Sequence, residues 1–233
     1  MDATLATAVY VDGYNLYYGR LRGTPYKWLD LVALFEALLH EQEPQALLSF
    51  VRYFSAPALA RFATNGDAAV LAQQDYHRAL ERRHAARVAI ELGAHHFNRA
   101  GVMLPRCIPG VQFDRQDRVR VWKIEEKQTE VNIALAMYRD ASKGALQQQV
   151  LCSNDRDAAP VLRAIREDFP HIRLGVVAPR SPSRAGEIRS AARELASFAH
   201  WTRHHLLDDE LARSQLPPVV ATVRKPIRRP AHW

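Results

Sequence analysis

Short apolar segments alternate with longer segments of helical periodicity along most of this 233-residue chain, and this alternation is what most constrains its fold. Each short segment is rich in apolar and often β-branched residues, and turn residues or a helical segment follow it. These properties predict strands rather than helices. We expect strands over 7–12, 46–54, 88–92, 149–153 and 172–177.

Helices are expected between these strands, where apolar residues recur at spacings of three and four. Asp30 suits the first turn of one helix, Gly144 suits the end of another, and Pro160 suits the first turn of a third, which ends at Asp168. Strands that alternate with helices form a mainly parallel sheet covered on both faces, so the sequence predicts an α/β fold. The other helices are expected over 29–39, 67–87, 127–143 and 183–200.

Two segments depart from this alternation. Residues 95–123 contain Pro and Gly and end in an alternating run at 119–123, which predicts a β-hairpin inserted in the α/β framework. Prolines alternate with basic residues after Leu216, which predicts an extended basic tail. We therefore expect one domain over 1–216, with the insertion at about 95–123, and a Pro-rich C-terminal tail over 217–233.

The composition suits a globular protein and excludes several classes. Lys and Arg number 32 against 25 Asp and Glu, and the formal charge of +7 attracts polyanions. Cys107 and Cys152 cannot build a disulfide framework, and neither has the spacing of a zinc site. The acidic Asp2 does not suit a signal peptide, and no apolar run approaches about 18 residues. We expect a cytoplasmic protein without a membrane partner.

Acidic residues follow two predicted strands and begin one predicted helix. In a parallel sheet, ligands bind outside the carboxyl ends of the strands, near the point where the strand order reverses. Carboxylates gathered there repel one another unless a cation lies between them. Oxygen ligands suit Mg²⁺ and Mn²⁺, which can activate water and orient a scissile phosphate. The residues concerned are Asp12, Glu130, Asp155 and Asp157.

Each of these acids also has a simpler interpretation. Asp12 suits the N-cap of the helix that follows it. Asp155 and Asp157 suit a turn and a helix cap. Glu130 lies one helical turn from Lys127, so an exposed ion pair would account for it. The pairs His95-His96 and His204-His205 lack a third ligand at a useful spacing, and no transition-metal site is expected at either pair.

Taken together, three segments resemble the NYN domain family, the branch of the PIN-like nuclease superfamily that includes bacterial LabA-like proteins. The segments are 9–18, 127–134 and 150–157, in the order of the family. Residues 214–217 are similar to a C-terminal signature of one bacterial subgroup. The resemblance covers about 7–217 and implies a PIN-like three-layer α/β/α sandwich.

The resemblance also implies a metal-dependent ribonuclease, an endoribonuclease, with a Mg²⁺ or Mn²⁺ cofactor. It makes Asp12, Glu130, Asp155 and Asp157 both the metal ligands and the catalytic residues. It makes Asn15, Lys127, Asn132, Ser153 and Asn154 the residues that contact the substrate or orient the ligands.

RNA is the partner that this resemblance implies, and a homodimer is compatible with it. Arginines of the insertion could flank the cleft, and aromatic residues could stack unpaired bases, although the same aromatics also suit a core. These are Arg99, Arg106, Arg115, Arg118 and Arg120, with Tyr14, Tyr17, Tyr18 and Phe97.

Two other functions remain open. One is a non-catalytic NYN module that binds RNA or a protein. The other is an aromatic-ring hydroxylase, an activity assigned to some relatives in the bacterial subgroup. The sequence carries no Gly-rich fingerprint for a flavin or dinucleotide and no haem motif.

Overall fold

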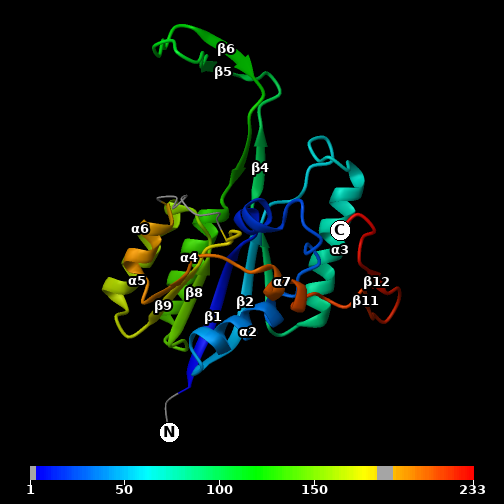
Figure 1. Ribbon diagram of the computed structural model, residues 1–233, viewed down its shortest axis with the longest axis vertical. Coiled ribbons are helices and arrows are strands. Elements are labelled where there is room, and N and C mark those ends of the chain that lie inside the picture. The colour runs from blue at the N-terminus through cyan, green and yellow to red at the C-terminus, as the bar shows by residue number, and fades with distance from the viewer. Residues whose placement is uncertain (1–3, 183–190) are drawn as a thin grey trace.

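Six strands form one parallel sheet, in the order β10-β9-β8-β1-β2-β3. The computed structural model describes residues 4–182 and 191–233 (Figure 1). Every strand pair in this sheet is parallel. The predicted α/β fold with a parallel central sheet is confirmed. The strands are β1 (Leu5–Asp12), β2 (Ala46–Ser55), β3 (Val88–Leu92), β8 (Gln148–Cys152), β9 (Arg173–Val177) and β10 (Trp201–Arg203).

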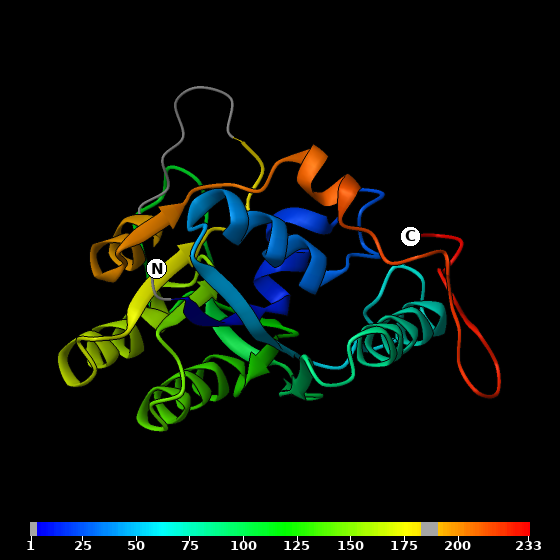
Figure 2. The ribbon, with the colours of Figure 1, turned by 90° about the horizontal axis from the view of Figure 1, so that it is seen from below.

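Helices cover both faces of the sheet because the central strand β1 is apolar on both sides. Val9 and Val11 pack into one core cluster and Ala8 and Tyr10 into another, as the alternation of side chains along a strand requires. In Figure 2, α2 (light blue) and α7 (orange) lie on one side of the sheet, and α4 (green) and α5 (yellow-green) lie on the other. The helices are α2 (Leu31–Gln42), α3 (Asp67–Arg83), α4 (Thr129–Ser142), α5 (Ala159–Asp168), α6 (Ala191–Phe198) and α7 (Asp208–Arg213).

Local signals set several helix ends as expected. Asp30 is the N-cap of α2, and its Oδ1 accepts hydrogen bonds from the backbone N–H groups of Val32 and Ala33, both at 3.1 Å. Gly144 follows α4 with a φ of +68°, and Pro160 lies in the first turn of α5. The predictions for Gly144 and Pro160 are confirmed, whereas Asp30, expected in the first turn, lies directly before it as the N-cap.

The other predicted helices have different bounds in the structure, and the one expected over 29–39 spans Leu31–Gln42. The helix predicted over 67–87 ends at Arg83, because a tight turn leads from His84 into β3, with the Arg87 N–H 2.7 Å from the His84 carbonyl oxygen. The helix predicted over 127–143 begins at Thr129, because Lys127 belongs to a strand and Gln128 is left-handed. Of the helix predicted over 183–200, residues 183–190 lie outside the described residues.

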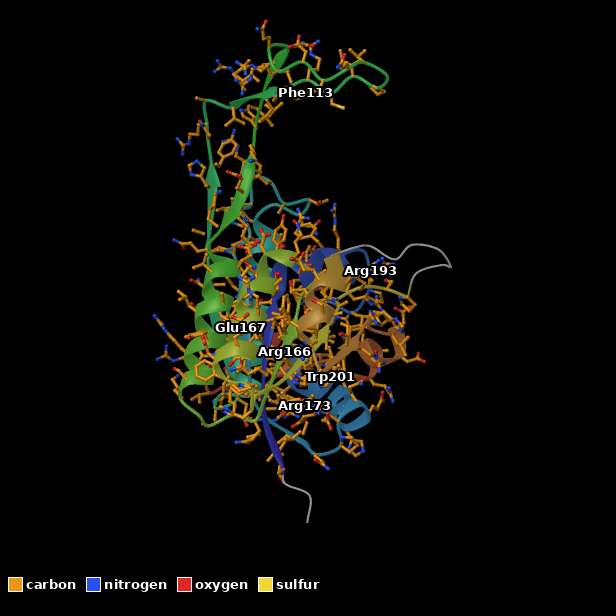
Figure 3. All side chains as sticks on the ribbon, turned by 90° about the vertical axis from the view of Figure 1, so that its left-hand side faces the viewer. Phe113, Arg166, Glu167, Arg173, Arg193 and Trp201 are labelled. Carbon is orange, nitrogen blue, oxygen red and sulfur yellow. The ribbon has the colours of Figure 1, made fainter. Side chains whose placement is uncertain are left out.

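The insertion is a long arm, residues 94–127, built from two antiparallel ladders. One joins β4 (Ala94–Phe97) to β7 (Ile124–Lys127), and the other joins β5 (Val102–Pro105) to β6 (Arg118–Val121). The arm extends from the carboxyl edge of the sheet, with β5 and β6 at its far end (Figure 1). Phe113 lies near that end and is 74% exposed (Figure 3). The inserted hairpin is confirmed, and its return strand continues to Lys127, beyond the predicted residue 123.

Residues 217–233 pack on the body rather than extending from it. Trp28 Nε1–H donates to the Pro217 carbonyl oxygen at 2.9 Å, and Val220 and Ile227 are buried. The Trp233 ring lies 5.6 Å from Tyr76 between centroids. Composition predicted an extended tail because prolines and basic residues dominate it, but its few apolar side chains fit the core beside α3. The strands β11 (Val219–Val220) and β12 (Ile227–Arg228) form a small antiparallel pair in this segment.

None of the helices in residues 4–182 and 191–233 is long and apolar enough to cross a membrane.

Candidate active site

The strand order reverses between β1 and β8, and Asp12 ends β1 at this point. The chain continues from β1 to β2 and β3 on one side of the sheet, and returns to β8 on the other side. Asp12 is 3% exposed. Its Oδ1 accepts a hydrogen bond from the Asn15 N–H, and its Oδ2 accepts one from the Ser153 hydroxyl, both at 2.9 Å. The two ends of adjacent strands therefore meet at one carboxylate, which also caps the short helix α1 (Gly13–Leu16).

Burial changes the acidity of Asp12. Burial raises the pKa of the Asp12 carboxyl above its usual value, and the charge on Glu130 raises it further. The hydrogen bonds from Asn15 and Ser153 act in the opposite direction and are the weaker influence. A buried carboxyl with a raised pKa at the edge of a parallel sheet is suited to taking up and returning a proton.

Glu126, on β7 of the arm, completes the charged part of this site and was not predicted from the sequence. Burial raises the pKa of Glu126, and the nearby charges of Asp12 and Glu130 raise it further, whereas a hydrogen bond from the Thr129 hydroxyl lowers it. Asp12, Glu126 and Glu130 are called the acidic group below. The sequence shows two adjacent acids, Glu125 and Glu126, directly before the segment at 127–134. Which of the two lies near Asp12 depends on the pairing of β7 with β4, which the sequence does not reveal.

The structure also brings Asn15, Ser153, Asn154 and Asp155 together beside Asp12. The Asp155 N–H donates to Ser153 Oγ at 3.0 Å, and the Asn154 N–H donates to Asn15 Oδ1 at 3.3 Å. Among the described residues, Asn154 Oδ1 is buried without a hydrogen-bond partner. These side chains orient Asp12 and line the turn after β8.

Other predicted site residues have different neighbours. Asp155 caps the short helix η2 (Arg156–Ala158) by accepting from the Asp157 N–H at 3.0 Å, and Asp157 itself is exposed. Lys127 Nζ pairs with Glu125 at 3.4 Å rather than with Glu130. Asn132 is half-buried on α4. Within the part of the chain that the structure describes, no side-chain hydrogen bond or ion pair joins Asp157, Lys127 or Asn132 to Asp12.

The predicted metal centre requires at least some of the acids to converge as ligands. In residues 4–182 and 191–233, no three His, Cys, Asp or Glu side chains form a group that could hold a metal ion. The oxygens of Asp12 and Asp155 instead accept the hydrogen bonds given above. In this arrangement the acidic side chains do not fit a metal ion, and no catalytic step is assigned to a metal. Binding of Mg²⁺ or Mn²⁺ stays a prediction.

Tyr53 and Gly13 form the floor of the site. A Cβ on Gly13 would lie 2.4 Å from Tyr53 Cζ and 2.7 Å from the Phe54 carbonyl oxygen, so only glycine allows this approach. Burial raises the pKa of the Tyr53 hydroxyl, and the charges of Asp12 and Glu126 add to this. The Tyr53 hydroxyl therefore stays protonated near these carboxylates.

The aromatic and basic residues predicted to contact RNA divide into two sets. Tyr14 and Tyr18 are 43% and 50% exposed beside the site, with ring centroids 4.4 Å apart. Three arginines of the arm are instead used within it. Arg106 pairs with Asp117, Arg118 donates to the Met103 carbonyl oxygen, and Arg120 donates to the Ala100 carbonyl oxygen.

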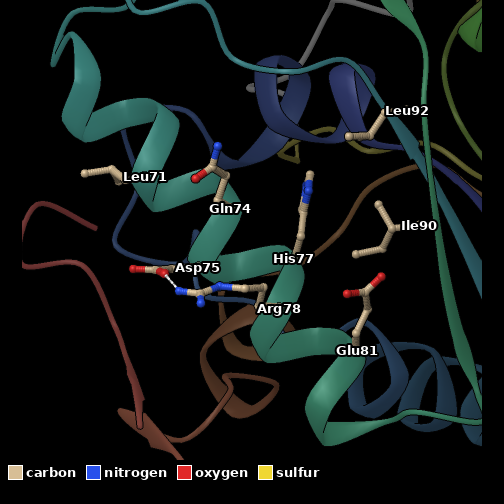
Figure 4. A pocket seen from close by; sticks show the side chains of 8 residues that line it. All are labelled: Leu71, Gln74, Asp75, His77, Arg78, Glu81, Ile90 and Leu92. Atoms are coloured by element: carbon tan, nitrogen blue, oxygen red, sulfur yellow. Dashed lines mark hydrogen bonds and ion pairs between the residues drawn. The ribbon is translucent and has the colours of Figure 1, made fainter. Parts of the chain in front are cut away.

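One surface hollow lies between α3 and β3, away from Asp12 (Figure 4). Its volume is about 470 Å³, and Leu71, Ile90 and Leu92 supply apolar walls. Burial lowers the pKa of His77 to about 4, so this imidazole is neutral at physiological pH. Arg78 is paired with Asp75, one turn away on the same helix α3 (Figure 4). The hollow therefore has no unpaired cation with which to bind an anion.

Comparison with known proteins finds similarity to a curated protein in sequence and to a solved protein in structure. No family model matches this chain. The 6-hydroxy-3-succinoylpyridine 3-monooxygenase HspA of Pseudomonas putida (strain DSM 28022 / S16) is 40% identical over 242 aligned positions, which cover 98% of this chain and 75% of that protein. A crystal structure of a protein of unknown function from Vibrio parahaemolyticus RIMD 2210633 has a TM-score of 0.50 and 16% identity, covering 90% of this chain and 97% of that one. It shows the same fold.

These findings correct the predicted family and activity. The assignment to the NYN nuclease family is wrong, and so is the prediction of a metal-dependent ribonuclease, because the relative that spans the chain is a monooxygenase. The aromatic-ring hydroxylase, one of the alternatives, is better supported. The physical reason is that the three segments gather acids at the carboxyl edge of a parallel sheet, which locates a site without defining its reaction.

Proposed function

Because this chain belongs to the family of the 6-hydroxy-3-succinoylpyridine 3-monooxygenase HspA, we propose that it is a monooxygenase that oxygenates a hydroxypyridine carrying an acidic side chain. The observation that carries this proposal is the sequence identity with HspA along nearly the whole chain. A monooxygenase inserts one atom of O₂ into its substrate and reduces the other to water with two electrons. A reductant is therefore the second substrate.

The chemistry of such a ring calls for a base. In 6-hydroxy-3-succinoylpyridine, the hydroxyl at carbon 6 is para to carbon 3. Removal of the hydroxyl proton places negative charge on carbon 3 and makes it more reactive toward an electrophilic oxygen. Carbon 3 carries the succinoyl group and no hydrogen, so when the new C–O bond forms there, the bond from carbon 3 to the acyl carbon must break. Water then takes up the acyl group, which leaves as a carboxylic acid, and the ring regains its aromaticity. General-base catalysis of this kind contributes about 10²- to 10⁴-fold in rate.

Asp12 is the side chain best suited to be this base. Its pKa is raised by burial, which makes the carboxylate a stronger base than an exposed aspartate. The hydrogen bonds from the Asn15 N–H and the Ser153 hydroxyl hold it in one orientation. Tyr53, protonated and buried beside it, would donate a hydrogen bond to the anionic oxygen of the ring.

The test is isotope incorporation under ¹⁸O₂. The purified chain is given 6-hydroxy-3-succinoylpyridine and a reduced nicotinamide, with and without added flavin, and the products are analysed by mass spectrometry. We expect one ¹⁸O atom in the aromatic product, and a reduction of about 100-fold or more in kcat for Asp12→Asn.

The matched control is Glu167→Gln, which removes an exposed carboxylate on α5 (Figure 3). This variant should keep the activity of the unmodified chain. Absence of ¹⁸O from the product with every reductant tried, in folded protein, would overturn the proposal. Equal activity of Asp12→Asn and the unmodified chain would instead show that Asp12 is not the base, and would leave the monooxygenase proposal standing.

A further inference from the structure

A groove of about 450 Å³ lies at the base of the arm, between the loop that follows β2 and the strand β4. Arg61 and Phe62 line it from the loop, and His95, Phe97 and Arg99 line it from the arm. It is called the arm groove below. None of these side chains takes part in the contacts that orient Asp12.

The guanidinium of Arg61 lies among aromatic rings. Its Cζ is 5.2 Å from the Phe97 centroid, 5.7 Å from the Phe62 centroid and 5.9 Å from the Trp122 centroid. Phe62 and Phe97 are themselves 4.9 Å apart in a T-shaped pair. Cation–π contacts of this kind fix the guanidinium in one place and leave its N–H donors free.

The arm groove also carries positive charge that no acidic side chain compensates. Across residues 4–182 and 191–233, no Asp or Glu forms an ion pair with Arg61 or Arg99, whereas Arg78 in the other hollow is paired with Asp75. Arg61 and Arg99 are both exposed at the wall of the arm groove. An arginine without a carboxylate partner in such a groove is suited to bidentate binding of a carboxylate.

His95 adds a polar acceptor at the inner end of the arm groove. Its Nδ1 is buried and has no hydrogen-bond partner among the described residues. Burial lowers the pKa of this imidazole, so it is neutral and its free nitrogen can accept a hydrogen bond.

The pairing of the arm connects the arm groove to the acidic group. His95 is directly opposite Glu126 in the antiparallel β4–β7 ladder. Residues in such pairs project from the same face of the ladder, so Glu126 lies next to the arm groove. A ligand that spans the two regions would meet carboxylates at one end and guanidinium groups at the other.

We propose that Arg61, supported by Arg99, binds the carboxylate at the end of the substrate's side chain, and that the ring then lies toward Glu126 and Asp12. The identity of this ligand rests on the proposed function. Asp12, Glu126 and Glu130 repel a carboxylate, and Arg61 and Arg99 attract it, so only one orientation of an acidic aromatic molecule satisfies both ends.

The test measures binding without a reductant, so that it does not depend on turnover. Calorimetry compares 6-hydroxy-3-succinoylpyridine with its methyl ester, in which the carboxylate is neutral. For the acid, Arg61→Ala should weaken binding about 10- to 100-fold, the effect of losing a hydrogen bond between charged groups. Arg61→Lys keeps the positive charge but lacks the planar guanidinium, so its affinity for the acid should lie between those of the unmodified chain and Arg61→Ala. The ester should bind the unmodified chain and Arg61→Ala alike.

Arg115→Ala is the matched control, because it removes an exposed arginine of the arm outside the arm groove. It should bind the acid as the unmodified chain does. The proposal is overturned if the unmodified chain does not bind the acid, or if Arg61→Ala and Arg99→Ala both bind it normally. It is also overturned if these variants raise only the KM for the reduced nicotinamide, since the arm groove would then hold the nucleotide. Normal turnover together with any of these results would leave the monooxygenase proposal intact.

Discussion

Asp12 combines a structural and a chemical role in one residue. It caps α1 and joins the ends of β1 and β8, and it is buried with a raised pKa. A cap usually lies where water can also reach the carboxylate. In Asp12, the capping hydrogen bonds only partly offset the loss of contact with water, so the pKa stays raised. The residue that caps α1 therefore also keeps its proton to a higher pH than an exposed aspartate does.

Replacement of Asp12 by Asn should stabilise the fold at neutral pH. Asn keeps an acceptor for the Asn15 N–H and removes a buried charge. Because the folded pKa of Asp12 is raised, the folded state loses stability as pH rises from the unfolded value of about 3.9 through the folded pKa. We therefore expect Asp12→Asn to raise Tm by about 2 °C or more at pH 7, with the gain disappearing below about pH 4. Calorimetric melts across this range test it, and a loss of stability at pH 7 would contradict it.

Ser153→Ala should move the pH dependence of activity. The Ser153 hydroxyl lowers the pKa of Asp12, so its removal leaves that pKa still higher. The acidic limb of the kcat/KM profile should then shift to higher pH by about one unit, as expected for one hydrogen bond to a charged group. Ser142→Ala, which removes a hydroxyl at the end of α4, is the control and should leave the profile unchanged. A shift to lower pH would show that Asp12 is not the group that titrates.

At the scale of elements, the arm has two parts with different roles. Its inner ladder carries His95 and Glu126, and thereby borders both the arm groove and the acidic group. Its outer ladder, β5 with β6, pairs only within itself, and many of its apolar side chains are exposed. A two-stranded ladder adds little stability when no third element covers it.

Removal of the outer ladder should therefore leave the body folded. We expect the chain in which Asn-Gly replaces Val102–Val121 to melt within about 2 °C of the unmodified chain, because the deleted residues do not reach the core. The inner ladder, with Arg61 beside Trp122, is retained. Circular dichroism melts provide the measurement. A fall of 10 °C would mean that the outer ladder supports the sheet.

At the scale of the whole molecule, the C-terminal segment closes one face of the core. Val220 and Ile227 are buried in the cluster that includes α2 and α3, and Trp233 packs against Trp28 and Tyr76. Arg229 donates to the carbonyl oxygen of Trp233, which holds the last residues in place. A segment rich in proline and basic residues thus contributes buried side chains to the core.

A chain that ends at Leu216 should be less stable by at least about 3 kcal/mol. Full burial of a Val or Ile side chain contributes about 1.5–3 kcal/mol, and two are lost together with the cover over Trp28. Urea unfolding measures the difference. The control is Val223→Ser, because Val223 is 92% exposed and its replacement should have no effect. Equal stability of the shortened and unmodified chains would refute this role for the segment.

Local sequence signals were enough to predict much of the fold. The apolar segments at 7–12 and 88–92 and the cap Gly144 depend on nearest neighbours along the chain, and each lies where expected. The three-residue strand β10 was not predicted, because so short a segment has no period of its own.

The site was predicted less completely than the fold. Asp12, Asp155 and Asp157 were expected at the sheet edge because they lie at or just after the ends of strands in a parallel sheet, whereas Ser153 was named only through the family resemblance. Glu126, Tyr53 and the arm groove were not, since each depends on pairing between distant segments. The reaction was predicted wrongly because acids at a sheet edge serve several chemistries, and the relative spanning the chain is a monooxygenase.

The sequence by itself determined the order of strands and helices and the edge of the sheet where a site forms, because periodicity and capping act over a few residues. Only the tertiary structure decided which side chains meet there. The Ser153 hydroxyl reaches Asp12 across 141 residues of chain, and the β4–β7 pairing sets His95 opposite Glu126. Such contacts are selected by the packing of whole elements, which no local pattern encodes.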